Sequence, residues 1–385
     1  MNNDKSINPS NWLEHPNNEW SFQNIETLFS TQRIHRGDQK PSEFILKNEP
    51  LDKIEFYNLE QKKQTVRQML RNGYADSFLV LKRGVIIYEE YFNGMNQSSI
   101  HLINSISKNF LGMLTGIIEK NKLIDVDKKV SEYLPEFSQS VFSETTLRHA
   151  LDMTAAVQYD ETYDNPNADF WHETSTVGWS PSLAMENPPS LLDFALSLKE
   201  KEQLDGGFYH YRTILTNIIA ITIEAATGKK MSNLLETLLW QKLRPEQDLL
   251  MVVDNKGYPY MGAGLNACTR DLARFGQMLL QQGIFNGNEV IPSSWIQETT
   301  NANQVYKDNF SKDPFGQLFV NGHYKNQTIV DKNGCLYCLG IYGQCVYINP
   351  KFETVIVKLS SQPSPAIPKL LIESVIAMNK IASSA

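Results

Sequence analysis

The sequence has no apolar stretch long enough to span a bilayer, and its first residues, Met1 to Pro9, contain no hydrophobic signal region. It also lacks a dense stripe of lysine and arginine, and its formal net charge is −7. These absences argue against a membrane-spanning segment and against nucleic acid as a natural partner. We therefore expect a cytoplasmic protein that binds neither a membrane nor a nucleic acid.

Cysteine is scarce, because the 385 residues contain only Cys268, Cys335, Cys338 and Cys345. Four cysteines are too few for a disulfide framework in a chain of this size. The pair Cys335-x-x-Cys338 has the spacing of zinc ligands, but a second such pair is missing and Cys345 lies in a strand-like run. We expect reduced, buried thiols and no metal site.

Several hydrolase signatures are also missing, namely a Gly-x-Ser-x-Gly elbow, a His-Glu-x-x-His pair and a P-loop. Of the seven histidines, His101 and His210 lie beside possible motifs. Neither has an orienting carboxylate in an obvious triad, so we expect both to be structural. The content of 41% hydrophobic and 21% charged residues describes an ordinary globular chain without repeats or low-complexity tracts.

One short stretch does carry chemistry, the Ser105-x-x-Lys108 motif at the start of a helical apolar pattern. A spacing of three residues puts both side chains on one side of the first helical turn. A close, desolvated lysine can take the proton of a serine nucleophile, and the helix N-terminus suits a developing oxyanion. The alternative is that Ser105 only caps the helix and Lys108 is solvated, and the motif alone does not decide between the two.

The pattern along the chain predicts β-rich ends around a helical middle. Residues 77–92 predict a hairpin that turns at 82–84, and residues 342–348 and 354–359 predict paired strands. Helices are expected at residues 52–72, 147–153, 191–198, 214–227, 271–281, 292–299 and 367–381. Residues 159–189 predict a long loop rich in aromatic side chains, which suits a pocket wall.

This organisation predicts an α+β fold in which both ends of the chain build an antiparallel sheet flanked by N- and C-terminal helices. We expect residues 1–60 to form an ordered arm wrapped on the core. Residues 61–104 and 255–385 would form the sheet domain, and residues 105–254 an inserted, mostly helical domain. The Ser-x-x-Lys helix would then lie at the interface of the two domains.

Several segments, taken in order, resemble the serine β-lactamase/penicillin-binding-protein superfamily, and most of all its class C-like esterase and amidase branch. Within that branch the chain is similar to 6-aminohexanoate-dimer (nylon-oligomer) hydrolases and to the carboxylesterases of the same family. The resemblance begins at about Trp12 and continues to the C-terminus. The segments that carry it are the hairpin, Ser105-x-x-Lys108, Leu147–Met153, Phe208–Thr213, Ala225–Gly228, Gly264–Gly276 and Gly340–Gln344.

The resemblance implies a role for each motif residue. Ser105 would be the nucleophile, Lys108 its base, and Tyr211 a partner in proton transfer. Thr213 stands where the family usually has Asn or Ser, so a hydroxyl is kept. The third motif, Cys338-Leu339-Gly340, lacks the usual cation, which counts against a β-lactamase or a DD-peptidase.

The remaining site residues follow from the same resemblance. The N–H groups of Ser105 and Ile341 would form the oxyanion hole, and Tyr163 would bind the nitrogen of the scissile amide. Trp179 matches a tryptophan that closes over the substrate, although it could simply pack the loop. The predicted substrate-binding residues are Trp179, Asn266, Thr213, Gly340 and Tyr342.

We therefore expect a serine hydrolase that cleaves small esters or short linear amides through an acyl-enzyme on Ser105, with no cofactor. The expected partner is a small-molecule ester or amide, and the protein would be a monomer or a homodimer. The alternatives are an acyltransferase on the same scaffold, a β-lactamase or DD-peptidase, and a non-catalytic binding protein.

Overall fold

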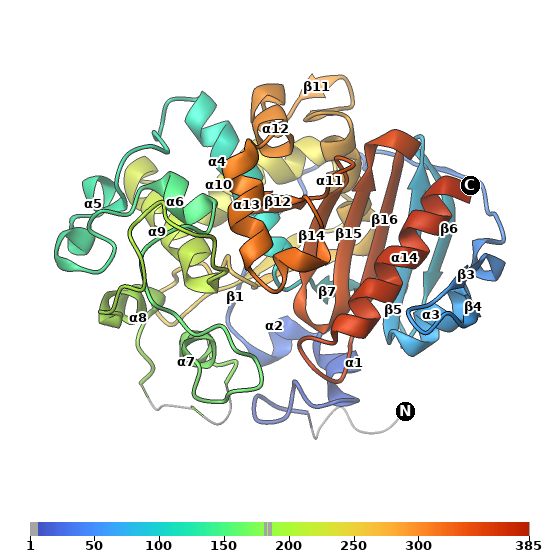
Figure 1. Cartoon of the computed structure of the whole chain (residues 1–385), viewed down its shortest axis with the longest axis horizontal. Coiled ribbons are helices and arrows are strands. Elements are labelled where there is room, and N and C mark those ends of the chain that lie inside the picture. Colours follow the sequence, from blue (N-terminus) through green and yellow to red (C-terminus); the bar gives the residue numbers. More distant parts are fainter. Residues whose placement is uncertain (1–6, 181–182, 184–186, 385) are drawn as a thin grey trace.

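The computed structural model describes residues 7–180, 183 and 187–384, and its largest unit is an eight-stranded sheet (Figure 1). Neighbouring strands are antiparallel, except that β2 and β6 run parallel. The strands come from both ends of the chain, which confirms the predicted α+β fold with an antiparallel sheet. Their order is β12 (His323–Lys325), β13 (Thr328–Val330), β14 (Leu336–Gly340), β15 (Gln344–Asn349), β16 (Thr354–Ser360), β5 (Ala75–Lys82), β6 (Val85–Tyr91) and β2 (Ile45–Leu46).

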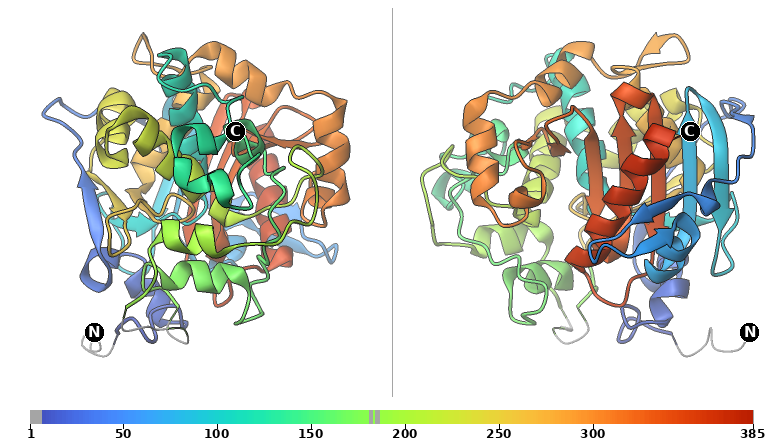
Figure 2. Two further views of the ribbon diagram at one scale, coloured as in Figure 1. Left: turned by 90° about the vertical axis from the view of Figure 1, so that its left-hand side faces the viewer. Right: turned by 45° about the vertical axis from the view of Figure 1, so that its right-hand side comes forward.

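Helices cover both faces of this sheet. Adjacent residues of β15 point to opposite faces. Cys345 Sγ lies 3.8 Å from Met378 Sδ of α14 (Pro368–Ser384), whereas Val346 faces α11 (Thr269–Leu280). On the α11 face, Phe110 of α4 (Ile106–Lys120) stacks on Phe275 at 4.0 Å. The α14 face also carries α3 (Val66–Asn72), and Figure 2 shows α14 crossing the sheet.

A second group of helices lies beside the β12 end of the sheet (Figures 1 and 2). At its centre is α9 (Thr213–Thr227), which is buried from Thr213 to Ile223 because its sequence is apolar nearly all round. The other helices of this group are α5 (Val130–Tyr133), α6 (Leu147–Leu151), α7 (Asp169–Ser175), α8 (Leu191–Ser197) and α10 (Met231–Leu234).

No helix in the described part of the chain is long and apolar enough to cross a bilayer.

A smaller, four-stranded antiparallel sheet joins the N-terminal arm to the segment before Ser105. Its order is β1 (Thr31–Ile34), β8 (Leu249–Val252), β9 (Leu265–Cys268) and β7 (Ile100–Leu102). The remaining elements are α1 (Asn17–Ser21), α2 (Ile25–Leu28), β3 (Glu55–Tyr57), β4 (Lys63–Thr65), β10 (Ile284–Phe285), β11 (Asn288–Glu289), α12 (Ser293–Thr300) and α13 (Gln304–Lys312).

The predicted helix over residues 52–72 is wrong in its first part, which forms the β3–β4 hairpin. The Asn58 side chain accepts from the N–H groups of Glu60 and Lys62, and this local hydrogen bonding favours a turn over a helix. The helix starts only at α3, where Thr65 and Gln68 form a capping box.

The predicted loop over residues 159–189, of which 181–182 and 184–186 lie outside the described residues, contains α7 and is less irregular there than expected. Tyr159 donates to Glu173 of α7, and Asn217 of α9 donates to the same carboxylate at 2.6 Å. These long-range contacts stabilise a short helix that the local sequence does not reveal. The predicted hairpin at 77–92 and the strand pair β15–β16 are confirmed, although Tyr342 and Gly343 lie in a turn before β15.

The N-terminal arm packs against the core through buried aromatic side chains. Trp12 is fully buried, and its ring lies 5.1 Å from Trp179 and 5.9 Å from Phe22. Phe22 in turn lies 5.2 Å from Tyr342, which follows β14. The arm therefore contacts the turn between β14 and β15.

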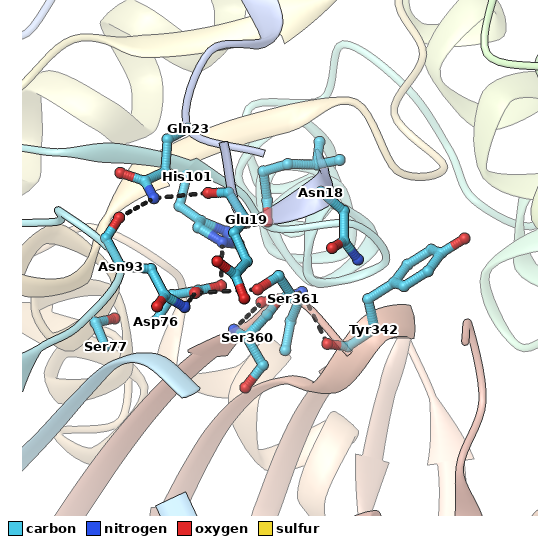
Figure 3. A network of polar contacts seen from close by, with 12 residues as sticks. Asn18, Glu19, Gln23, Asp76, Ser77, Asn93, His101, Tyr342, Ser360 and Ser361 are labelled. Carbon is cyan, nitrogen blue, oxygen red and sulfur yellow. Dashed lines mark hydrogen bonds and ion pairs between the residues drawn. The ribbon is translucent and has the colours of Figure 1, made fainter. Parts of the chain in front are cut away.

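A buried ion pair connects the large sheet to the strand before Ser105 (Figure 3). His101 Nε2 lies 3.1 Å from Asp76 Oδ2, and His101 Nδ1 lies 2.7 Å from the Leu102 carbonyl. Asp76 Oδ1 accepts from Asn93 and Ser361 at 2.6 and 3.1 Å. Both ring nitrogens of His101 face acceptors, so the geometry fits an imidazolium bound to a carboxylate. His101 thus has a carboxylate partner that its sequence context did not suggest.

Asp76→Asn should destabilise the protein strongly, because it leaves the buried His101 without its counter-charge. Removing one member of a buried pair costs about 3–5 kcal/mol. The free energy of unfolding in urea would measure the loss. Ser77→Ala is the matched control on the same strand, since it removes only a neutral hydrogen bond to Thr269 and should cost about 1 kcal/mol. Equal losses in the two variants would contradict the ion-pair assignment.

Candidate active site

Ser105 lies at the N-terminus of α4, in a tight turn that leaves β7. Asn104 adopts a left-handed conformation with φ of 47°, which asparagine tolerates better than most residues. Its side-chain Nδ2 donates to the Ile341 carbonyl at 3.0 Å. The turn that presents Ser105 is thereby connected directly to the end of β14.

Lys108 is buried one turn further along α4, and its amine contacts three oxygen atoms. Nζ lies 3.0 Å from Ser105 Oγ, 3.1 Å from Thr213 Oγ1 and 2.6 Å from the Gly262 carbonyl. Burial lowers the pKa of Lys108 to about 8, although nearby carboxylates oppose this shift. The predicted pairing of Ser105 with a desolvated lysine is therefore present in the geometry.

Tyr211 lies on the other side of the same amine, with its ring centroid 4.9 Å from Lys108 Nζ. Burial raises the pKa of Tyr211, the Glu161 carboxylate raises it further, and a hydrogen bond with Ser105 opposes the rise. The phenol is therefore held in its neutral form. A neutral phenol suits a proton donor better than a base.

Gly340 and Ile341 approach Ser105 from β14. A Cβ atom on Gly340 would lie 2.7 Å from the carbonyl oxygen of Ile103, so only glycine allows the two segments to come this close. Ser105, Lys108, Tyr211, Tyr163, Gly340 and Ile341 all line one cavity of about 330 Å³. This volume is at the lower end of the range for small-molecule sites.

Glu161 also lines this cavity, and the sequence interpretation missed it. It accepts hydrogen bonds from Thr213 N at 2.7 Å, from Thr213 Oγ1 at 2.6 Å and from the Tyr163 hydroxyl at 3.1 Å. The only signal for it in the sequence is an acidic residue two positions before the loop tyrosine. Nothing local distinguishes it from the neighbouring Asp160.

Four of the predicted substrate-binding residues are not among the residues that line this cavity. Thr213 contacts Lys108 and Glu161, Trp179 packs 5.2 Å from Tyr260 in the buried cluster of the arm, and Tyr342 packs on Phe22. Asn266 is buried in β9 and donates to Gly264.

The cavity continues past the end of β14 to the first turns of α14. Its wall there includes Leu339, Cys345 and Lys358, which are direct neighbours across β14, β15 and β16. Lys358 Nζ donates to Ser360 Oγ at 2.5 Å and to the carbonyls of Gly73 and Gly343 at 3.3 Å. Because its three N–H groups are already donated, Lys358 does not replace the cation that the third motif lacks.

Comparisons with known proteins identify relatives of this chain. The β-lactamase family model matches residues 63–371. The chain is 30% identical over 359 residues to a 6-aminohexanoate-dimer hydrolase of Paenarthrobacter ureafaciens, covering 92% of this chain and 88% of the relative.

Two solved structures extend the comparison. A putative 6-aminohexanoate-dimer hydrolase from Bacillus anthracis superposes with a TM-score of 0.88 at 26% identity, over 99% of this chain and 98% of that one. A family VIII carboxylesterase superposes with a TM-score of 0.60 at 15% identity, over 82% and 96% of the two chains. The second likeness concerns the fold alone.

Gly262→Ala should lower the reactivity of Ser105. A Cβ atom on Gly262 would lie 2.5 Å from Thr213 Cγ2, so either Thr213 or the Gly262 carbonyl must move away from Lys108. We expect the rate at which a fluorophosphonate labels Ser105 to fall by about 10-fold or more, since base catalysis depends on this geometry. An unchanged labelling rate in a folded variant would contradict the assignment of these contacts.

Proposed function

We propose that this chain, a serine hydrolase that belongs to the β-lactamase family, cleaves small esters or short linear amides through an acyl-enzyme on Ser105. The observation that carries the proposal is the position of Lys108 Nζ, 3.0 Å from Ser105 Oγ with its other two contacts on acceptor oxygens. A lysine desolvated in this way can act as the base for a serine nucleophile.

In the first step, uncharged Lys108 takes the hydroxyl proton of Ser105 while the Ser105 oxygen attacks the substrate carbonyl carbon. The oxyanion accepts hydrogen bonds from the backbone N–H groups of Ser105 and Ile341. The bond to the leaving group then breaks, and the leaving oxygen or nitrogen takes a proton. Tyr211 is the better donor, because burial keeps its phenol neutral and its ring lies 4.9 Å from Lys108 Nζ, whereas the Tyr163 hydroxyl donates to Glu161.

In the second step, water attacks the acyl-enzyme and gives a proton to the Tyr211 oxygen, which lost its own proton to the leaving group. The ester bond to Ser105 Oγ then breaks as the Lys108 ammonium returns its proton to the serine oxygen, so both residues regain their starting forms. The products are a carboxylic acid and the free serine. These steps use acid–base and covalent chemistry of the chain alone and require no metal or organic cofactor.

The cavity supports a small, elongated substrate with apolar parts. Apart from the catalytic groups, its wall is largely aliphatic and aromatic, and it extends from the helical side to α14. Such a wall favours apolar chains over strongly charged ones. The residues that give it this character include Phe315, Leu318, Tyr324, Tyr337, Leu339, Ile367 and Leu371.

Ser105→Ala should abolish both covalent labelling and hydrolysis. We would measure intact-protein mass after incubation with a fluorophosphonate, and turnover of p-nitrophenyl acetate and of a 6-aminohexanoate dimer. One adduct is expected in the wild type and none in Ser105→Ala, because the attacking oxygen is gone. Ser107→Ala is the control. The Ser107 hydroxyl donates to the Asn104 carbonyl, so we do not expect it to be the labelled group, and this variant should keep the adduct.

The same assay, extended with an added amine or alcohol and with a β-lactam, separates the alternatives. Absence of an adduct and of turnover in the wild type would overturn the hydrolase proposal and favour a binding protein. Amide or ester products formed with an added amine or alcohol would show acyl transfer. Turnover of a β-lactam but not of either linear substrate would favour a β-lactamase.

Hydrolysis should depend on pH through Lys108. Burial lowers its pKa to about 8, and only the uncharged amine can accept the serine proton. Activity is therefore present above this pKa and is lost as the pH falls through it. We expect kcat/KM for p-nitrophenyl acetate to rise with an ascending limb near pH 8, and a flat profile between about pH 6 and about pH 9 would contradict the role of Lys108.

A further inference from the structure

Glu161 is a carboxylate in the wall of the cavity that the steps above do not use. We propose that Glu161 is a positioning residue, which orients the lone pair of Lys108 toward Ser105 through the hydroxyl of Thr213. This inference rests on the proposed function, since it concerns how the proposed base is prepared.

Glu161 is the acceptor in each of its side-chain hydrogen bonds, which is the pattern of a carboxylate. Oε2 accepts from Thr213 N at 2.7 Å, and Oε1 accepts from Thr213 Oγ1 at 2.6 Å and from the Tyr163 hydroxyl at 3.1 Å. Thr213 is the first residue of α9, so the carboxylate also faces the positive end of a long helix. Burial raises the pKa of Glu161 above its usual value, and Lys108 and these hydrogen bonds oppose part of that rise.

The direction of these hydrogen bonds determines what Thr213 can do for Lys108. A threonine hydroxyl has one proton, and here that proton is donated to Glu161. The Thr213 oxygen must therefore accept from Lys108 Nζ, which lies 3.1 Å away. Glu161 thus makes Thr213 an obligatory acceptor toward the lysine.

The same count applied to Lys108 gives the orientation of its lone pair. An uncharged amine has two N–H groups and one lone pair. The Gly262 carbonyl at 2.6 Å can only accept, and the Thr213 oxygen accepts as well, so both N–H groups are used. The third direction, toward Ser105 Oγ at 3.0 Å, is left for the lone pair. This is the arrangement that a general base requires.

The charge of Glu161 also favours proton transfer from Ser105 to Lys108. Transfer from Ser105 makes Lys108 an ammonium, and a nearby carboxylate favours that charged form. Glu161 is not itself placed as the base, because its two oxygens accept from Thr213 and Tyr163 rather than from Ser105.

The test is Glu161→Gln, which keeps the shape of the side chain but replaces one acceptor oxygen with an NH₂ group. When the amide oxygen accepts from Thr213 N, the NH₂ donates to Thr213 Oγ1, and the hydroxyl then points its proton at Lys108. We expect the fluorophosphonate labelling rate of Ser105 to fall by about 100-fold, the scale of general-base catalysis. The ascending limb of its pH profile should move below that of the wild type, because removing the carboxylate lowers the pKa of Lys108.

Two further variants make the test specific. Asp160→Asn removes a charge from the neighbouring position, where the side chain accepts from Thr162 and Asn165, and should leave the labelling rate and its pH profile unchanged. Thr213→Val should lower the labelling rate as much as Glu161→Gln does. The double variant should lower it no further, because both changes break the same chain of contacts.

A Glu161→Gln variant with the wild-type labelling rate and pH limb would overturn the inference, as would additive losses in the double variant. A lower melting temperature with an unchanged pH limb would likewise show that Glu161 only caps α9. These results differ from a failure of the proposed function, in which the wild-type Ser105 would not be labelled at all.

Discussion

The candidate active site depends on one buried nitrogen, the amine of Lys108, and on the three oxygen atoms that surround it. These oxygens belong to Ser105, Thr213 and Gly262, which are far apart in the chain. A lysine removed from water loses much of its preference for the charged form, and burial lowers the pKa of Lys108 to about 8. The fold therefore has to bring α4, the start of α9 and the segment before β9 to a single point.

The sheets and the arm keep Ser105 in its position relative to that point. β7 pairs with β9, the Asp76–His101 ion pair connects β5 to β7, and Asn104 donates to the Ile341 carbonyl. Ser105, the proposed nucleophile, is thereby connected both to the sheet that carries Gly340 and to the small sheet that contains β9. Rigid elements hold catalytic groups more accurately than loops do, because packing locks their side chains.

The proposed site differs in two places from the pattern that the family resemblance implies. Thr213 stands in the second motif where Asn or Ser is usual, and its hydroxyl is donated to Glu161. The third motif has no cation, and Lys358, although it lines the same cavity, uses its three N–H groups within the protein. A site without an available cation has less to offer a substrate carboxylate, which is consistent with the proposed preference for small esters and linear amides.

Local sequence by itself determined the elements whose signal is periodic. The apolar spacing of α4, the hairpin β5–β6 and the pair β15–β16 could all be predicted, as could the spacing that puts Ser105 and Lys108 on one helical turn. Tertiary structure alone decided that Glu161 rather than Asp160 lies next to Thr213, and that Trp179 packs on Trp12 instead of lining the cavity. The physical reason is that periodicity and turn chemistry act between near neighbours, whereas these contacts join residues many positions apart and form only when the whole core packs.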